Sequence, residues 1–173
     1  VRGCFQDSLL PWLRNHIWPE EERFAERAYR DAVTAEFRSS LLAVGTTAAM
    51  VFGSPKSDSV HAVLRDLAPL GIKGGDVLMD RNGPAALLRS TAECVEDLSS
   101  NADHYGDRYV LTPRFAPTCS DELMEGCGQR LAAGEVRLQT HLAENPDEVA
   151  WVRELHPDAR SYTAVYQQHG LLG

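Results

Sequence analysis

The feature that most restricts the fold of this chain is a repeated alternation between β-type runs and helical segments. The β-type runs span residues 46–53, 75–80, 107–115 and 136–143, and the helical segments that follow them span residues 57–71, 83–103, 120–134 and 145–155. Strands that are connected through helices lie parallel and are joined by right-handed crossovers. The alternation therefore predicts an α/β fold with a parallel sheet, preceded by one or two helices over residues 19–45.

Two of the helical segments carry clear start signals. Ser120 is a suitable N-cap for the third helix, with Leu123 three residues further on. The fourth begins with Asn145 as N-cap and Pro146 at the first helical position, and Glu148 occupies the capping-box position. These signals predict helix starts at residues 120 and 145.

Two architectures accommodate the alternation: an open doubly wound sheet and part of a (β/α)₈ barrel. No G-x-G-x-x-G or Walker-type loop follows any predicted strand, which excludes the usual nucleotide-binding form of the open sheet. In a barrel, functional residues lie at the carboxyl ends of the strands. Polar residues occur near the carboxyl ends of three of the runs, namely Asp80, Arg114 and His141. We therefore expect residues 1–173 to form a partial (β/α) barrel domain.

The composition argues against several classes of partner. The formal net charge is −8 and no block of Lys or Arg is present, so the chain lacks the positive surface that binds nucleic acids or anionic membranes. No apolar run reaches the roughly 18–20 residues that span a bilayer, and the first residues lack signal-peptide features. The four cysteines form no C-x-x-C pair, which argues against a zinc finger and favours a reducing cytoplasm. The absence of an initial Met suggests that residues precede Val1.

The segment over residues 136–145 carries the first pair of candidate catalytic residues. Side chains alternate along a strand, so His141 shares a face with Arg137 and Gln139, and in a barrel this face lines the lumen. An imidazole there suits a catalytic zinc ion, and Glu144 is placed to move a proton of a metal-activated water. The spacing is not the H-E-x-x-H of metalloproteases or the signature of cytidine-type deaminases. The alternatives are a structural histidine and an acidic residue that only favours the next helix start.

Residues 112–120 carry the second pair of candidates. Arg114 follows a strand and offers fixed, paired donors to a carbonyl or carboxylate group. Phe115 offers a flat face on which a planar ring can stack. Together they suit a polar aromatic ligand such as a nucleobase, and the alternative is a surface Arg beside a core Phe.

Other polar residues favour structural roles. Asp80–Asn82 is a turn-type sequence, and the carboxylates of Glu20–Glu22 are expected to be exposed in a first helical turn. No two of the remaining histidines have the spacing of metal ligands, and His61 and His156 are expected to be solvated.

A set of motifs follows along nearly the whole chain: "LLPWLRNHIWPEE", "VGTTAAMVFG", "VLMDRN", "TPRFAPTCSDELM", "THLAENPDEVAWVRELHPDARSYTAVY" and "HGLLG". Together they resemble the guanine deaminases of the amidohydrolase superfamily, and "TPRFAPTCS" and "THLAEN" are the most specific of them. The resemblance implies a metal-dependent (β/α)₈ TIM barrel that hydrolyses guanine to xanthine and ammonia. It also implies one zinc ion and, for the complete protein, a homodimer.

Residue by residue, the resemblance implies four roles. His141 matches the metal-binding His at the end of the family's fifth strand, and Glu144 matches the Glu that serves as proton shuttle. Arg114 and Phe115 match the pair that holds guanine. In this mechanism zinc lowers the pKa of a water, and Glu144 takes a proton as the oxygen attacks C2 of guanine. The same carboxylate then passes protons to a ring nitrogen and to the leaving ammonia.

The chain also departs from the family pattern. The H-x-H of the first strand and the later His and Asp ligands are absent, and an intact barrel takes about 250 residues. We therefore expect an internal segment, roughly strands two to five of the barrel, that is inactive by itself. A smaller departure is Asp76, where the resemblance implies Lys. The alternatives for function are another amidohydrolase that acts on a heterocycle and a barrel fragment without catalysis of its own.

Overall fold

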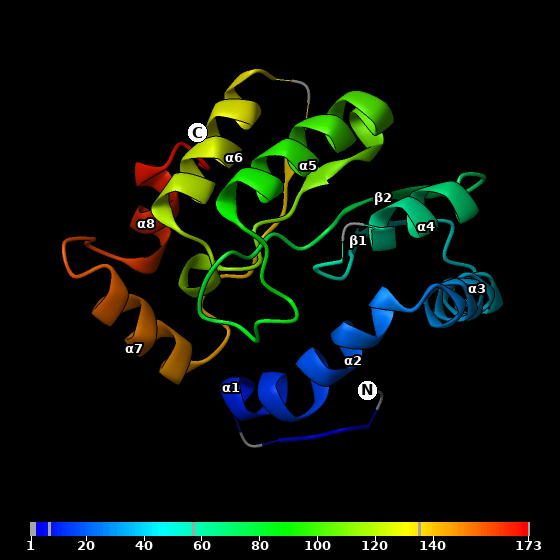
Figure 1. Ribbon diagram of the computed structural model, residues 1–173, viewed down its shortest axis with the longest axis horizontal. Helices are drawn as coiled ribbons and strands as arrows, with labels where there is room; N and C mark the ends of the chain where they lie inside the picture. Colours follow the sequence, from blue (N-terminus) through cyan, green and yellow to red (C-terminus); the bar gives the residue numbers. More distant parts are fainter. Residues whose placement is uncertain (1–2, 7, 57, 135, 173) are drawn as a thin grey trace.

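The computed structural model describes residues 3–6, 8–56, 58–134 and 136–172, and its helices and strands alternate along the chain (Figure 1). The chain starts with the short helices α1 (Leu9–Trp12) and α2 (Trp18–Glu22), which a π-helical turn over Leu13–Ile17 joins, and continues into α3 (Arg27–Ala43). The strands among the described residues are β1 (Ala48–Phe52), β2 (Gly71–Gly75), β3 (Val110–Leu111) and β4 (Arg137–Leu138). Between and after them lie α4 (Asp58–Asp66), α5 (Thr91–Tyr105), α6 (Asp121–Ala132), α7 (Pro146–Leu155) and α8 (Tyr162–Gln168).

The strands of the described residues are parallel and neighbour one another in chain order. Strand β1 pairs with β2 from Ala48↔Gly71 to Phe52↔Gly75, and β3 pairs with β4 at Val110↔Arg137 and Leu111↔Leu138. Two further parallel bridges, Gly74↔Tyr109 and Leu78↔Pro113, connect the first pair to the second. Parallel neighbours joined by helical crossovers are the predicted α/β architecture, which is confirmed.

Strand β2 lies close to both of its neighbours because it ends in two glycines. A Cβ atom at Gly74 would meet the carbonyl oxygen of Val51 at 2.6 Å, and one at Gly75 would meet that of Val110 at 1.9 Å. The glycines therefore allow a backbone approach that any side chain would prevent. The glycines also explain why the strand was predicted at residues 75–80 instead of 71–75, since glycine favours no β-strand.

Hydrophobic side chains form one core cluster between the strands and the later helices. Leu78, Tyr109 and Leu111 from the strand region pack with Leu98 of α5 and Leu123 of α6 in this cluster, which α7 and α8 extend. In Figure 1, α5 and α6 lie on the side of the strands away from α1 and α2, whereas α7 lies beside α1. The strands therefore separate α5 and α6 from the N-terminal helices.

A second cluster attaches the N-terminal helices to the strand ends. Leu13 and Trp18 pack there with Met79, Leu87 and Phe115. This contact brings residues from the start of the chain beside the segment that follows β3. The arrangement matters for the candidate site, because it adds a wall of helix to the strand ends.

The four cysteines are free thiols. Cys94, Cys119 and Cys127 are buried, and burial raises the pKa of the Cys94 thiol to about 11 and that of Cys119 to about 12. These thiols stay protonated at neutral pH and pack as small apolar groups.

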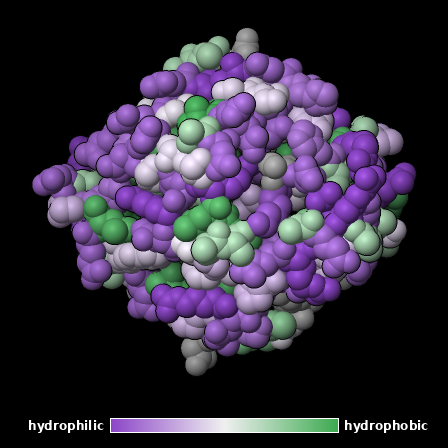
Figure 2. Space-filling model, viewed as in Figure 1, coloured by the Kyte–Doolittle hydropathy of each residue, from purple (hydrophilic) through white to green (hydrophobic). Residues whose placement is uncertain are grey.

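The surface in Figure 2 is mostly hydrophilic, and hydrophobic side chains gather there only in small separate areas. Large hydrophobic side chains that are exposed include Met50 and Phe52 of β1 and Leu142 beyond β4. Within the described ranges, no helix is both long enough and apolar enough to cross a membrane.

The predicted helix starts at residues 120 and 145 are confirmed. The Ser120 hydroxyl accepts the N–H of Leu123 at 3.1 Å, and Asn145 and Glu148 form a capping box. The start of α5 was predicted wrongly at residue 83. A capping box at Ser90 sets the actual start, and the preceding segment forms turns.

Other differences concern short elements. Helices α1 and α8 were not predicted, because four and seven residues are too few to display a helical period. Gly71 was expected to end a helix, but it is the first residue of β2. Strands β3 and β4 are much shorter than the apolar runs that contain them.

Candidate active site

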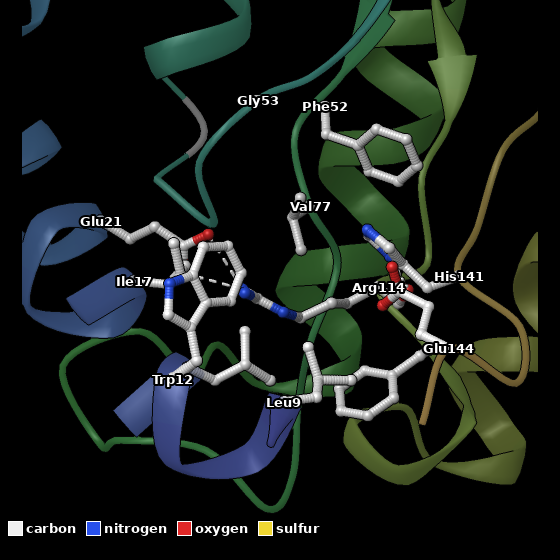
Figure 3. A pocket seen from close by; sticks show the side chains of 12 residues that line it. Leu9, Trp12, Ile17, Glu21, Phe52, Gly53, Val77, Arg114, His141 and Glu144 are labelled. Atoms are coloured by element: carbon white, nitrogen blue, oxygen red, sulfur yellow. Dashed lines mark hydrogen bonds and ion pairs between the residues drawn. The ribbon is translucent and has the colours of Figure 1, made fainter. Parts of the chain in front are cut away.

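The four residues predicted for the site line one cavity of about 300 Å³ at the carboxyl ends of the strands (Figure 3). Arg114 and Phe115 follow β3, and His141 and Glu144 follow β4. The volume lies at the lower end of the range of about 300–1,000 Å³ that is typical of ligand pockets. The structure therefore brings together residues that are separated along the chain.

His141 is oriented by the backbone of Arg114. Its ring Nδ1 lies 2.7 Å from the carbonyl oxygen of Arg114, and its backbone N–H donates to the same oxygen at 3.2 Å. A carbonyl oxygen can only accept, so Nδ1 carries a proton, and in the neutral imidazole Nε2 then keeps its lone pair. This is the arrangement of metal-binding histidines, in which the second nitrogen is held by a hydrogen bond. The Phe52 ring lies against the imidazole, with 4.4 Å between ring centroids.

The described residues around His141 do not form a complete metal site. No group of three or more His, Cys, Asp or Glu side chains within the described ranges is arranged to hold a metal ion. Catalytic zinc sites usually use three protein ligands. A zinc ion at this position therefore needs ligands in addition to those that the structure describes.

Arg114 is buried and forms an ion pair across the cavity. Its Nη1 donates to Oε1 and Oε2 of Glu21 at 3.0 and 2.7 Å, and it also contacts Sδ of Met79 at 3.9 Å. Only 7% of the Arg114 side chain and 16% of the Glu21 side chain are exposed. The alternative of a surface Arg is therefore wrong.

The prediction that Glu20–Glu22 form an exposed turn is wrong for Glu21. Glu21 lines the cavity, whereas Glu22 is exposed. Burial raises the pKa of the Glu21 carboxyl, and the adjacent Arg114 guanidinium opposes this rise. Burial disfavours the charged form of a carboxyl group, so an ionised carboxylate in such a place costs stability. Carboxyl groups with shifted pKa values of this kind are common at functional sites.

Phe115 belongs to the core and to the cavity wall at the same time. Its ring is 3% exposed and packs in the cluster with Leu13 and Trp18. Trp151 of α7 meets it edge-on, with 6.1 Å between ring centroids. The core interpretation and the ligand-stacking interpretation are therefore compatible.

Glu144 is exposed on a loop whose backbone is hydrogen-bonded to the buried side chain of Glu148. Its N–H donates to Oε2 of the fully buried Glu148 at 2.8 Å, and Oε1 of Glu148 accepts the hydroxyl of Tyr162 at 2.7 Å. The preceding residue, Ala143, has a φ of 54°, which is rare for a residue other than glycine. The loop is thus held in a strained conformation that presents Glu144 to the cavity.

Asp80 and Asp76 have structural partners and do not line this cavity. Asp80 accepts from the hydroxyl of Thr91 at 2.7 Å and from the backbone N–H of Ser120 at 2.7 Å. It therefore joins the starts of α5 and α6, and the turn interpretation of this segment is supported by the positive φ of Asn82. Asp76 is fully buried, with Arg89 at 2.7 Å.

The prediction that His156 is solvated is wrong, because its side chain is 10% exposed and accepts from Arg81 at 3.3 Å. His61 is half-buried and contacts the hydroxyl of Tyr105. Neither of these imidazoles lines the cavity, whereas His141 does.

The N-terminal wall of the cavity was missed from the sequence. Its lining residues are spaced by four along the helices: Leu9, Leu13, Ile17 and Glu21. Such spacing puts side chains on one helix face, so the row was available as a signal. It was overlooked because Glu21 has acidic neighbours on both sides, which favours a solvated turn.

Comparisons with known proteins agree with the fold. The sequence model of the Amidohydrolase family matches residues 3–173. The guanine deaminase of Escherichia coli (strain K12) is 41% identical over 99% of this chain and 40% of its own length. The guanine deaminase of Dictyostelium discoideum is 31% identical over 95% of this chain and 38% of its own length. The chain thus spans about two fifths of these curated relatives.

Solved structures give the same result. A guanine deaminase from C. acetobutylicum with guanine bound in the active site has a TM-score of 0.93 and 34% identity, over 99% of this chain and 43% of its own. A triazine hydrolase has a TM-score of 0.74 at 22% identity, over 95% of this chain and 41% of its own, and supports the fold alone. The predicted similarity to part of a (β/α)₈ barrel is therefore confirmed.

Proposed function

Because the chain belongs to the amidohydrolase family, we propose that the whole protein hydrolyses guanine to xanthine and ammonia. The observation that carries this proposal is the convergence of Arg114, Phe115, His141 and Glu144 on one cavity. Relatives at 31–41% identity that bear the name guanine deaminase support the choice of substrate.

His141 is the proposed zinc ligand of this chain. Its Nδ1–H is held by the carbonyl of Arg114, so the Nε2 lone pair is available for coordination. Zinc supplies a water whose pKa is lowered to about 7. The remaining ligands are proposed to come from residues other than those described.

Glu144 is the proposed proton carrier. Its carboxylate takes a proton from the attacking water while the oxygen bonds to C2 of guanine, and it delivers this proton to a ring nitrogen. It then carries the second proton of the water to the amino group at C2, whose bond to carbon breaks to release ammonia. Guanine and one water are thereby converted to xanthine and one ammonia.

Arg114 and Phe115 are the proposed substrate-binding residues. The guanidinium donates to acceptor atoms on the polar edge of the purine, and the Phe115 ring supports its flat face. The apolar walls formed by Leu13, Ile17 and Val77 exclude water, which strengthens these hydrogen bonds.

The proposal is tested by xanthine formation from guanine with the whole protein and its Glu144→Gln variant. We expect turnover by the wild-type protein and a loss of about 10²–10⁴-fold in kcat for the variant, with zinc content unchanged. Glu154→Gln, an exposed position on α7, is the matched control. Near-full turnover by Glu144→Gln would refute the proton-carrier role.

Faster turnover of adenine, a pterin or a triazine than of guanine would favour the alternative, another amidohydrolase that acts on a heterocycle. Each of these rings lacks part of the donor and acceptor pattern of guanine. The comparison therefore tests the substrate separately from the chemistry of Glu144.

A further inference from the structure

We propose that Glu21 is a positioning residue that holds the Arg114 guanidinium in the orientation needed to bind the purine. This inference rests on the proposed function and assigns a role to a residue of the N-terminal helices. Glu21 lies 93 positions away from Arg114 in sequence and lines the same cavity.

The contact is built as a fixed ion pair. Both carboxylate oxygens of Glu21 accept from a single nitrogen, Nη1 of Arg114, at 3.0 and 2.7 Å (Figure 3). Both side chains are largely shielded from water, which strengthens a charge-assisted hydrogen bond. The sulfur of Met79 contacts the same nitrogen at 3.9 Å. These contacts fix one amino group of the guanidinium and, because the group is planar, restrict its rotation.

The hydrogen bonds leave a defined set of donors for a ligand. Within the described part of the chain, the guanidinium of Arg114 donates through Nη1. The other edge of the group, Nε–H and one Nη2–H, consists of two parallel donors. Guanine carries two adjacent acceptors, O6 and N7, and paired donation from Arg to these atoms is a common recognition contact. We assign this edge to the purine.

The packing of the N-terminal helices places Glu21 beside Arg114. Leu9, Leu13, Ile17 and Glu21 follow one another at intervals of four and line the cavity together. The row passes through the π-helical turn Leu13–Ile17, and π-helical turns are frequent at functional sites. Leu13 is also anchored beside Phe115 in the second core cluster. The helix wall and the two proposed substrate-binding residues therefore form one packed unit.

The test is a double-mutant cycle on the whole zinc-loaded protein. The variants are Glu21→Gln, Arg114→Ala and the combination of both, and Glu22→Gln, the exposed neighbour, is the control. We expect Glu21→Gln to raise KM for guanine roughly tenfold, because Gln keeps one acceptor oxygen but loses the charge and the second acceptor that hold the Arg114 guanidinium. The change in kcat is expected to be less than about threefold, since Glu21 does not touch the reacting atoms.

Binding is measured independently through the inhibition constant of xanthine, which carries the same O6 and N7 atoms. This constant is expected to rise in parallel with KM. In the Arg114→Ala background, Glu21→Gln is expected to change KM by less than about twofold, because Glu21 acts through the missing guanidinium.

Different results separate the two proposals. A wild-type protein that forms no xanthine overturns the proposed function. If the wild-type protein is active, an unchanged KM in Glu21→Gln overturns only the positioning role. An equal KM increase in the presence and absence of Arg114, or a loss of zinc together with kcat, likewise overturns it, since either result means that Glu21 acts by another route.

Discussion

We expect the replacement of Glu148 to show how much this side chain stabilises the loop that carries Glu144, independently of the chemistry of Glu144 itself. The Glu148 carboxylate is fully buried at the start of α7. It accepts the N–H groups of Glu144 and Asn145 at 2.8 and 3.3 Å and the hydroxyl of Tyr162 at 2.7 Å. The carboxylate thus holds three donors, two of which belong to the loop that carries the proposed proton carrier.

The number of donors sets the size of the expected effect. A buried donor without a partner costs about 1–3 kcal/mol, so Glu148→Ala has an upper limit of about 9 kcal/mol. Water that enters the space left by the side chain reduces the expected loss of stability to about 3–5 kcal/mol. Glu148→Gln keeps one oxygen for the backbone N–H groups and offers an amide to the Tyr162 hydroxyl, which can accept. We therefore expect a loss of only about 1–2 kcal/mol, from the missing charge.

Denaturant unfolding of the whole protein measures these differences, provided that the dependence on denaturant concentration is unchanged between variants. Hydrogen exchange of the Glu144 and Asn145 amides reports on the loop, and both amides are expected to lose protection in Glu148→Ala. The exposed Glu154→Ala on the same helix is the control. If Glu148→Ala and Glu148→Gln both fell within about 0.5 kcal/mol of the wild type, the reasoning from buried donors would be refuted.

Five further changes have expected outcomes. Arg114→Ala is expected to raise KM for guanine with zinc content retained, as measured by steady-state kinetics. Phe115→Ala is expected to raise KM as well and to cost about 3–5 kcal/mol of stability because its ring is in the core. Unfolding midpoints distinguish the two variants. Ala143→Gly relieves a positive φ and is expected to raise the free energy of unfolding by up to about 1 kcal/mol, measured by denaturant unfolding. Asp76→Asn weakens one of the two carboxylate contacts of Arg89, which keeps its ion pair with Asp97, and is expected to cost about 1.5–3 kcal/mol, measured in the same way. Burial lowers the pKa of His156, so stability is expected to fall as the pH drops below about 6.5, and His156→Gln is expected to reduce this dependence.

The parallel architecture and the helix starts at Ser120 and Asn145 were predictable because they depend on local signals. Alternation of apolar runs with capped helices determines the order of the elements, and the caps follow from side chains within three positions. The positions of Arg114 and His141 were predictable for the same reason, since the end of a parallel strand lies at the end of the sheet where sites form.

The contacts across the cavity were not predictable from local patterns. The pair of Glu21 and Arg114 depends on how the N-terminal helices pack on the strand ends. The spacing by four places Glu21 on the helix face of Leu13 and Ile17 but does not identify its partner. The prediction that His156 is solvated was wrong for a similar reason, because its burial depends on Arg81 from a distant turn. Strand β2 was misplaced because close backbone approach, rather than side-chain pattern, defines it at Gly74 and Gly75.

The carbonyl oxygen of Arg114 has a consequence for how motion affects the site. That oxygen accepts both the backbone N–H and the ring Nδ1–H of His141. Under the proposed function, residue 114 would be linked through its side chain to the purine and through its peptide oxygen to the imidazole. A displacement of this strand end would then move both attachment points together, which would help to keep the separation between purine and metal. Reaction rates depend on contacts of about 3–3.5 Å between the reacting atoms, and a common anchor protects that separation better than two independent ones.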